Sequence, residues 1–318
     1  FTTKAYASSS NFKIWVEDFK TKAINSGISK SVVDEIMTNA RFLPKVIEYD
    51  RYQPEFYEDT FTYIKKRSGK SKVKKGSKLY KKEKAIIDEI EKKFLVEKEI
   101  LLALWGIETN FGKHVGKMDI ISSLATLSYD KRRRDFFSSQ LLTLLKLIDD
   151  QLIDPKTLYG SWAGAYGNFQ FMPSTIKSYA IDYDKNNVIE LKKVEDSFAS
   201  AANYIKKIGW NKNDFCFKKV HLSNKIPKKY LNTSARKIKN KTSIKKIKRF
   251  LINKDSYNLN DKSIVGVITP DKDIIPDAEN LSPAYIVFDN YELVLKWNRS
   301  LRFALAVCTL KDKFNNDL

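Results

Sequence analysis

The chain has 318 residues, of which 42% are hydrophobic and 13% aromatic, so a sizeable buried core can form. Its formal net charge of +20 fits either a polyanionic partner or lysines spread over solvated faces. No stretch has the roughly 18–20 apolar residues of a membrane-spanning helix. With only two histidines, a His-rich metal site or a His-dependent catalytic triad is all but excluded.

The first two thirds of the chain are predicted to be mostly helical. Apolar residues recur at helical spacing through residues 11–65 and again from residue 83 to residue 107. Residues 66–82 between them are rich in Lys, Ser and Gly, and we expect an exposed loop there. Residues 134–152 and 197–208 have the pattern of two further amphipathic helices.

The character of the chain changes near residue 213. Residues 213–283 carry many Lys, Asn, Ser and Thr, with short β-like runs such as Ser263–Thr269. Tyr285–Phe288 is expected to return the chain toward the core, and residues 291–310 to form a closing helix. The fold class is therefore predicted to be mainly α with a small β-containing domain.

These patterns divide the chain into four parts. We expect an N-terminal helical region over residues 1–85 and a helical core over 86–212. A small α/β or β insertion follows over 213–283, and residues 284–318 return to the core.

Two features bear on the compartment of the protein. Cys216 and Cys308 are the only cysteines; they either pair or are both buried thiols, and their spacing does not decide. Ala5-Tyr6-Ala7 is similar to the end of a secretory signal whose apolar part is missing, the alternative being a disordered tail. Since no cysteine lies near the start, we expect no lipid anchor there.

One carboxylate stands out from its surroundings. Glu108 lies near the end of the otherwise apolar segment Leu101–Gly112, and Gly112 is a natural helix terminator. Apolar surroundings and the negative end of the helix dipole both disfavour the ionised form, so both are expected to raise the pKa of Glu108. A raised pKa suits a general acid. The alternative is a glutamate that points outward from the last helical turn.

A second segment, Gly160–Ser174, is rich in small and aromatic residues. Six of the eleven glycines lie between residues 106 and 167, which indicates tight backbone packing. Gln170 can donate and accept hydrogen bonds, as sugar amides and hydroxyls require. Trp162, Tyr166 and Phe169 offer flat faces for sugar rings. The alternative is a Gly-rich turn that only packs on the core.

Together, "GIETNFG" (Gly106–Gly112) and "GSWAGAYGNFQFMPS" (Gly160–Ser174) resemble the lytic murein transglycosylase B family. Further matches follow in the same order along residues 45–310: "QPEF" (Gln53–Phe56) and Tyr63, "SLATLSYDKRRRDFF" (Ser123–Phe137), "ASAANYIKKIGW" (Ala199–Trp210) and "WNRSLRFALAV" (Trp297–Val307).

The resemblance implies a lysozyme-like helical catalytic core and a defined reaction. Such enzymes cleave the β-1,4 bond between N-acetylmuramic acid and N-acetylglucosamine without water and leave a 1,6-anhydro end. One Glu protonates the leaving oxygen and then deprotonates the C6 hydroxyl, while the N-acetyl group replaces a second carboxylate. A standard glycosidase needs two carboxylates that flank the bond. Here only Glu108 lies in a motif; Asp119 and Asp130 are nearby in sequence, but neither has surroundings comparable to those of Glu108.

The resemblance also assigns sugar-cleft residues by motif position. Ser161 is expected to orient Glu108 as well as to line the cleft. The residues carried over as substrate-binding are Tyr63, Ser161, Gln170, Tyr204, Trp297, Asn298 and Phe303.

The sequence departs from the family pattern at three positions in two of these segments. The family reads Tyr-Asn with a second Tyr five residues beyond the Asn, whereas this chain has Trp297-Asn298 and Phe303. Tyr166 replaces a usual Met. Trp and Phe keep a stacking face but lose a hydroxyl, so we expect these changes to affect substrate preference more than the type of reaction.

An Asp- and Asn-rich turn follows the Gln motif. Oxygen-bearing side chains alternate there as in a calcium loop, although Asn187 replaces the usual Gly and Lys193 occupies the last ligand position. The resembled family uses a longer loop, which Asp196 would complete. The predicted ligands of a structural Ca²⁺ are Asp182, Asp184, Asn186, the Val188 carbonyl and Asp196. The alternative is a simple turn; the chemistry requires no cofactor.

Three other functions compete with a lytic transglycosylase. A hydrolytic muramidase would differ only in its product, and a non-catalytic wall-binding protein would have lost Glu108 or its motif. A nucleic-acid binder is suggested by the charge and by Lys239–Arg249, but no nucleic-acid motif is present. The expected partners are peptidoglycan glycan strands and other cell-wall enzymes, in the periplasm.

Overall fold

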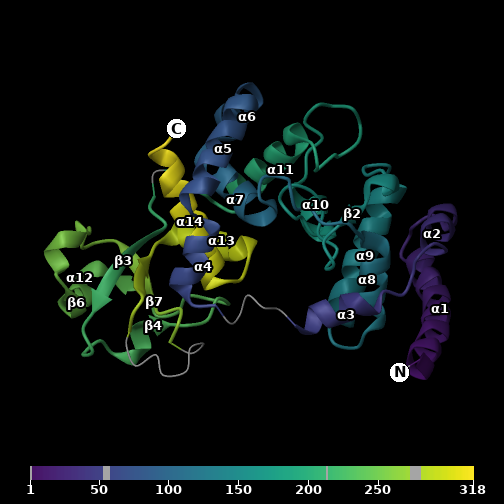
Figure 1. The fold of residues 1–318 in the computed structure, drawn as a ribbon, viewed down its shortest axis with the longest axis horizontal. Coiled ribbons are helices and arrows are strands. Elements are labelled where there is room, and N and C mark those ends of the chain that lie inside the picture. Colours follow the sequence, from purple (N-terminus) through teal and green to yellow (C-terminus); the bar gives the residue numbers. More distant parts are fainter. Residues whose placement is uncertain (1, 53–57, 213, 273–280) are drawn as a thin grey trace. The chain divides into compact units, whose positions relative to one another are not determined.

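The computed structural model describes residues 2–52, 58–212, 214–272 and 281–318, and the side chains of these residues except 2–10, 255 and 256. The chain forms two compact units (Figure 1). Unit 1 consists of Phe1–Gln53 and Glu108–Tyr204, and unit 2 of Pro54–Ile107 and Ile205–Leu318.

Unit 1 is helical. Its elements are α1 (Thr2–Asn25), α2 (Lys30–Met37), α3 (Pro44–Arg51), the end of α7 (Lys98–Thr109), β1 (Met118–Asp119), α8 (Ile120–Tyr129), α9 (Arg134–Asp149), the 3₁₀ helix η2 (Pro155–Thr157), β2 (Tyr159–Gly160), α10 (Pro173–Tyr179) and α11 (Val194–Lys207), whose last residues belong to unit 2.

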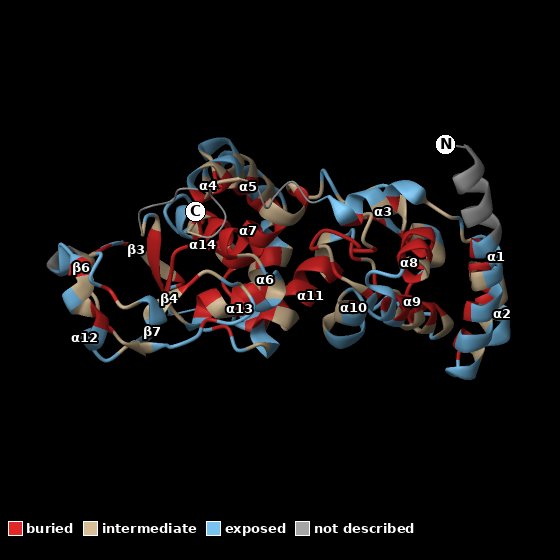
Figure 2. Cartoon of the chain, turned by 90° about the horizontal axis from the view of Figure 1, so that it is seen from below, coloured by how far each residue is buried: buried red, intermediate tan, exposed pale blue. Residues whose placement is uncertain are grey.

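Helix α8 forms the centre of unit 1. Asp119 caps its N-terminus by accepting hydrogen bonds from the backbone of Ile121 and Ser122. Every residue from Ile120 to Ser128 is buried, as the red colour of α8 in Figure 2 reflects. Two of its buried hydroxyls are satisfied by the incoming chain, because Ser122 and Thr126 accept from the backbone N–H groups at positions 41 and 43.

Unit 2 combines helices with a small sheet. Its helices are α4 (Thr60–Arg67), α5 (Lys70–Lys82), α6 (Lys84–Phe94), α7 up to Ile107, η3 (Lys228–Tyr230), α12 (Ile244–Ile247), η4 (Lys248–Phe250), η5 (Lys254–Tyr257), α13 (Asp289–Trp297) and α14 (Leu301–Asn315). Its strands are β3 (Phe217–Leu222), β4 (Leu231–Asn232), β5 (Thr242–Ser243), β6 (Leu251–Ile252), β7 (Ile264–Ile268) and β8 (Ala284–Val287).

The sheet has the strand order β4-β7-β8-β3-β6, with β5 also paired to β7. Among the described strand pairs of this sheet, the β4–β7 pair alone is parallel. Its small core is aliphatic, with Val220, Val267 and Ile286 from the strands and Ile244 and Ile247 from α12. The prediction of a mainly helical chain with a small β-containing part is confirmed.

Two expectations from the sequence need correction. Residues 70–82 form helix α5, not a loop, because Val73, Ser77 and Tyr80 recur at helical spacing on its buried side and lysine is a good helix former. The closing helix is two helices, α13 and α14, because the chain is extended at Asn298 and Ser300. Tyr285–Val287, where the chain was expected to return toward the core, are buried and belong to β8 in the middle of the sheet.

Among the described residues, no helix is both long enough and apolar enough to cross a membrane. Cys216 and Cys308 form a disulfide with their Cα atoms 6.1 Å apart, which joins the segment before β3 to α14. Both cysteines are buried. The question that their spacing left open is thus answered in favour of a pair.

Loss of the disulfide is expected to destabilise unit 2. The bond closes a loop of 92 residues, and closing a loop of this size lowers the entropy of the unfolded chain by an amount worth about 4 kcal/mol. The double variant Cys216→Ser/Cys308→Ser should therefore unfold at a lower guanidinium concentration. Dithiothreitol should shift the wild type toward the variant and leave the variant unchanged; equal midpoints for oxidised wild type and variant would contradict this.

Candidate active site

Glu108 is the next-to-last residue of α7 and is half-buried. The helix ends directly after it, because Asn110, Phe111 and Gly112 all have positive φ angles of 51°, 60° and 76°. Such a run is rare outside glycine. The backbone N–H of His114 returns to the carbonyl of Thr109 at 2.8 Å and closes the turn. The carboxylate thus sits on a fixed helix end.

Thr109 ties this helix end to the second motif. Its buried hydroxyl donates to the carbonyl of Asn168 at 2.8 Å and accepts from the N–H of Gly112 at 3.0 Å. The Asn168 side chain in turn donates to Ser197 Oγ at 3.0 Å and to the carbonyl of Lys192 at 3.1 Å. The sequence reasoning did not single out Thr109 or Asn168; their position inside the two motifs was the available signal.

The glycines let two backbone segments touch. Strand β1 pairs antiparallel with β2, with Met118 opposite Gly160. A Cβ atom at Gly116 would lie 2.1 Å from the carbonyl oxygen of Gly160, and one at Gly160 would lie 2.1 Å from that of Ala165. Real Cβ atoms do not approach so closely, so Gly116 and Gly160 are required where the backbone at Gly116 approaches the second motif and where that motif folds on itself.

The side chains of Gln170 and Ser161 are both held by backbone groups. Gln170 has a φ of 52°, and its side-chain N–H groups donate to the carbonyls of Gly167 at 2.9 Å and Val115 at 3.2 Å. Ser161 Oγ accepts from the N–H of Ala165 at 2.9 Å. A hydroxyl whose oxygen accepts in this way can still donate its proton.

Two of the aromatic residues expected to face sugar rings do not. Tyr166 and Phe169 are each 2% exposed. The Tyr166 hydroxyl bonds Thr157 Oγ1 at 3.0 Å, and burial raises the pKa of Tyr166. Phe169 packs edge-on against Phe198. The idea that Tyr166 and Phe169 offer stacking faces is therefore wrong, because both rings fill the core; Trp162 is only half-buried.

Tyr204 is the last residue of unit 1 and belongs to an aromatic cluster. Its ring stacks on Tyr179 with centroids 4.2 Å apart and meets Phe171 edge-on at 5.9 Å. Burial chiefly, and Tyr179 in addition, raise the pKa of Tyr204. Its hydroxyl therefore stays protonated at neutral pH and can act as a hydrogen-bond donor.

The remaining predicted sugar-binding residues lie in unit 2. Tyr63 is buried, with the Arg67 guanidinium 3.6 Å from the centre of its ring. Phe303 is buried in α14, whereas Trp297 is half-buried at the end of α13 and Asn298 is exposed. The "QPEF" segment, Gln53–Phe56, lies outside the described residues.

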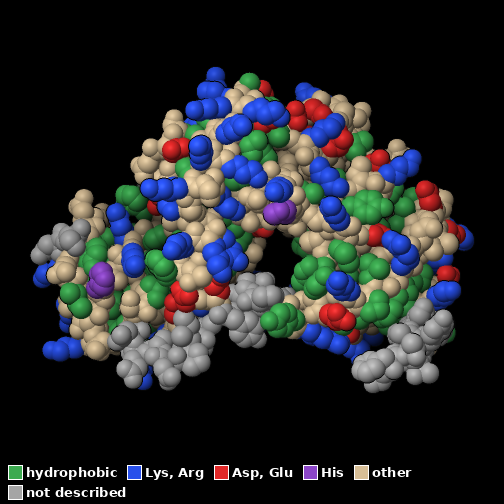
Figure 3. Space-filling model, in the orientation of Figure 1, with side chains coloured by type: hydrophobic (Ala, Val, Ile, Leu, Met, Phe, Trp, Pro, Cys, Tyr) green, Lys and Arg blue, Asp and Glu red, His purple; other side chains and the backbone are tan. Residues whose placement is uncertain are grey.

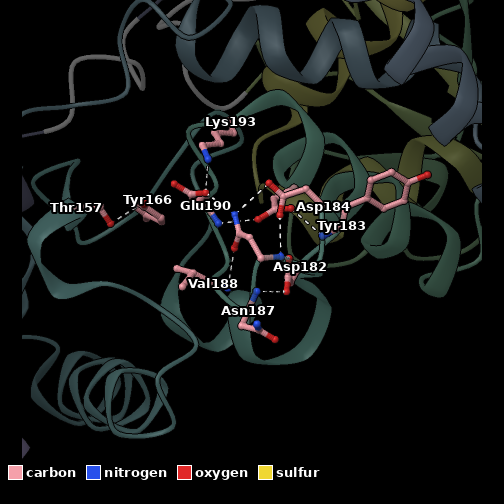
Figure 4. A network of polar contacts seen from close by, with 11 residues as sticks. Thr157, Tyr166, Asp182, Tyr183, Asp184, Asn187, Val188, Glu190 and Lys193 are labelled. Carbon is pink, nitrogen blue, oxygen red and sulfur yellow. Dashed lines mark hydrogen bonds and ion pairs between the residues drawn. The ribbon is translucent and has the colours of Figure 1, made fainter.

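Three carboxylates lie close together at the acidic turn between α10 and α11: Asp182 and Asp184 of the turn, both labelled in Figure 4, and Asp196 in the first turn of α11. Oxygen atoms of Asp182, Asp184 and Asp196 lie within 4.8 Å of one another. Asp196 is 1% exposed and accepts hydrogen bonds from the backbone of Tyr183 and of Glu190, both at 2.7 Å. Burial raises the pKa of Asp196, and the charge of Asp184 adds to the rise while these hydrogen bonds oppose it.

The other predicted ligands are arranged less favourably for a cation. Asn186 directs its side-chain nitrogen to Asp184 and Glu190, and its oxygen accepts from the N–H of Val188 at 2.9 Å. Its amide must rotate before the oxygen can join the carboxylates. Lys193, at the position where a standard loop has its last ligand, forms an ion pair with Glu190.

The fold and the site define a lysozyme-like protein, with one glutamate at a helix end against a glycine-rich segment. Residues 11–312 match the family model described as the transglycosylase SLT domain, so the chain belongs to this family. The predicted resemblance is confirmed by a curated relative, membrane-bound lytic murein transglycosylase B of Escherichia coli K12. The two are 33% identical over 209 residues, which are 62% of this chain and 58% of the relative.

Solved structures give the same result over more of the chain. SltB3 of Pseudomonas aeruginosa, in complex with NAG-anhNAM-pentapeptide, superposes with a TM-score of 0.83 at 29% identity, covering 96% of this chain and 79% of that one. The lytic transglycosylase Slt35 of Escherichia coli, in complex with calcium, superposes with a TM-score of 0.78 at 26% identity, covering 95% and 93%.

Proposed function

We propose that the protein is a peptidoglycan lytic transglycosylase that cleaves the β-1,4 bond between N-acetylmuramic acid and N-acetylglucosamine. The observation that carries this proposal is the fixed position of Glu108 at the end of α7, which Thr109 ties to the segment containing Ser161 and Gln170. Family membership supports it, as does the anhydro sugar bound to SltB3.

In the proposed mechanism Glu108 acts twice. Its carboxyl proton passes to the glycosidic oxygen as the bond to C1 of the muramic acid breaks. The resulting carboxylate then takes the proton of the C6 hydroxyl, whose oxygen attacks C1 and closes the 1,6-anhydro ring. Glu108 ends in its starting state and no water is consumed. The N-acetyl group of the muramic acid stabilises the positive charge at C1, in place of a second carboxylate.

The other residues are proposed to bind and orient. The Ser161 hydroxyl, which accepts a hydrogen bond from the Ala165 N–H, donates a hydrogen bond to the Glu108 carboxylate and so orients it. The Gln170 carbonyl oxygen accepts a hydrogen bond from a sugar N–H or hydroxyl. The further cleft residues are Tyr63, Tyr204, Trp297, Asn298 and Phe303. Residues 86–212 are proposed as the catalytic core, flanked by a helical region over 1–85, an insertion over 213–283 and a returning segment over 284–318.

The products of peptidoglycan digestion test this function. Purified peptidoglycan is digested and the masses of the released muropeptides are measured. Muropeptides one water lighter than their hydrolysed counterparts are the expected result. Full-mass reducing ends would instead identify a hydrolytic muramidase on the same fold, and binding without release would identify a wall-binding protein.

The acidic turn is proposed to hold a structural Ca²⁺. Asp182, Asp184 and Asp196 supply carboxylate oxygens at a spacing that suits a hard cation, and Slt35 was solved in complex with calcium. Asn186 would join after rotation of its amide, with the Val188 carbonyl. A bound cation would offset the mutual repulsion of these carboxylates and the burial of Asp196.

Calcium is expected to stabilise the protein against heat. At a free concentration 100 times the dissociation constant, binding to the folded state alone adds about 2.7 kcal/mol. The thermal midpoint should rise with CaCl₂ and fall again with EGTA, and Asp184→Asn should remove most of this response. Asp154→Asn, in the same unit but outside the turn, serves as the control. If the thermal midpoint of the wild type did not change with CaCl₂, the proposed calcium site would be refuted.

The proposed setting follows from the proposed reaction. The partners are glycan strands and other enzymes of the wall, and the compartment is the periplasm. A disulfide between Cys216 and Cys308 agrees with an oxidising compartment.

A further inference from the structure

Helix α5 has the most one-sided charge of the described helices of unit 2. It contains seven lysines in 13 residues and no acidic residue. Lys70, Lys74, Lys78 and Lys81 follow one another at intervals of four, four and three residues, so they share one exposed helix face. Figure 3 shows Lys and Arg side chains gathered over the region where α5 lies in Figure 1.

These four lysines line a groove of about 850 Å³ together with Lys313 of α14. Among the described residues, none of the five forms an ion pair with an acidic side chain. One carboxylate, Asp317, also lines the groove and accepts a hydrogen bond from Ser77. The groove therefore keeps a large excess of positive charge.

An apolar pocket of about 350 Å³ shares Lys313 with this groove. Phe61 of α4 and the neighbouring rings of Phe217 and Tyr285, 5.3 Å apart, form much of its lining. Lys65 and Lys219 line it as well, and no acidic residue does among those that the structure describes. Phe61 is 69% exposed, the highest value among the large hydrophobic side chains that the structure describes.

We propose that this face of unit 2, made of the lysine groove and the Phe61 pocket, binds the surface of an anionic phospholipid bilayer. The lysines contact headgroup phosphates, and their apolar stems lie along the lipid interface. Phe61 and its pocket meet the apolar part of the lipid, as interfacial aromatic residues do. A soluble polyanion would use the lysines alone, whereas an anionic amphiphile uses both the groove and the pocket.

Vesicle sedimentation with the full chain tests the proposal. We expect binding to vesicles of phosphatidylcholine mixed with phosphatidylglycerol, little binding to pure phosphatidylcholine, and weaker binding as salt is added. The variant K70E/K74E/K78E should lower the partition coefficient by at least about 100-fold, because the loss of three lysines near an anionic surface accounts for that much and the introduced glutamates are repelled in addition. K225E/K228E/K246E changes the net charge equally on other exposed lysines of unit 2 and should bind nearly as the wild type does.

Phe61→Ser isolates the apolar contribution and should lower vesicle binding about tenfold. The neutral variant K70Q/K74Q/K78Q should also bind the vesicles more weakly than the wild type. An unchanged circular dichroism spectrum of each variant excludes misfolding as the cause of the loss. Equal losses in K70E/K74E/K78E and K225E/K228E/K246E would overturn the proposal. So would equal binding to charged and uncharged vesicles, or capture by heparin without binding to the mixed vesicles.

Discussion

Glu108→Gln is expected to lower the rate of muropeptide release from purified peptidoglycan by about 10³-fold. A glutamine side chain has the shape of the glutamic acid but cannot give or take the proton, and general acid–base catalysis by one side chain contributes about 10²–10⁴-fold. The rate is measured from the masses and amounts of released anhydro-muropeptides. Binding of the variant to insoluble peptidoglycan should persist, because the other cleft residues are unchanged.

Glu195→Gln is the matched control for this experiment. Glu195 lies in the first turn of α11, in the same unit as Glu108 and half-buried like it, but outside both motifs. Its variant should release muropeptides at the wild-type rate. If Glu108→Gln kept more than a tenth of the wild-type rate, the role proposed for Glu108 would be untenable, whatever the product of the wild type.

Arg302→Met is expected to destabilise unit 2 by about 3–5 kcal/mol, the cost of removing one partner of a buried ion pair. Arg302 of α14 is 4% exposed and donates to Asp271 at 3.1 Å. Asp271 also accepts from the N–H of Thr60 at 3.1 Å and from its hydroxyl at 2.5 Å. The start of α4, the segment after β7 and α14 are thus joined by one buried carboxylate, which the substitution leaves without its cation.

Guanidinium unfolding of three variants measures this effect. Arg302→Met should lower the unfolding midpoint most, and the added change Asp271→Asn should restore part of it, because a neutral amide oxygen still accepts from Thr60. Arg299→Met, at an exposed position three residues earlier, should have little effect. A loss below about 1 kcal/mol for Arg302→Met would mean that water or another group compensates Asp271.

The two motifs and most helices could be predicted from the sequence, because their signals are local. Apolar spacing predicted the helices at residues 134–152 and 197–208, which the structure has as α9 and α11. Local reasoning failed at α5, where composition concealed the spacing of Val73, Ser77 and Tyr80. It also failed for Tyr166 and Phe169, because an aromatic ring in a glycine-rich segment can equally well pack in the hydrophobic core or stack on a sugar ring.

The sequence by itself therefore determined the family, the fold class and the identity of the candidate acid, Glu108. Only the tertiary structure decided the Cys216–Cys308 pair, whose members are 92 residues apart. It also revealed the bond between Thr109 and Asn168, 59 residues apart, and that between Arg302 and Asp271. Such contacts form because segments far apart in the sequence pack together and their buried polar groups must then find hydrogen-bond partners. Residue spacing and composition along the chain do not predict which of these groups will pair.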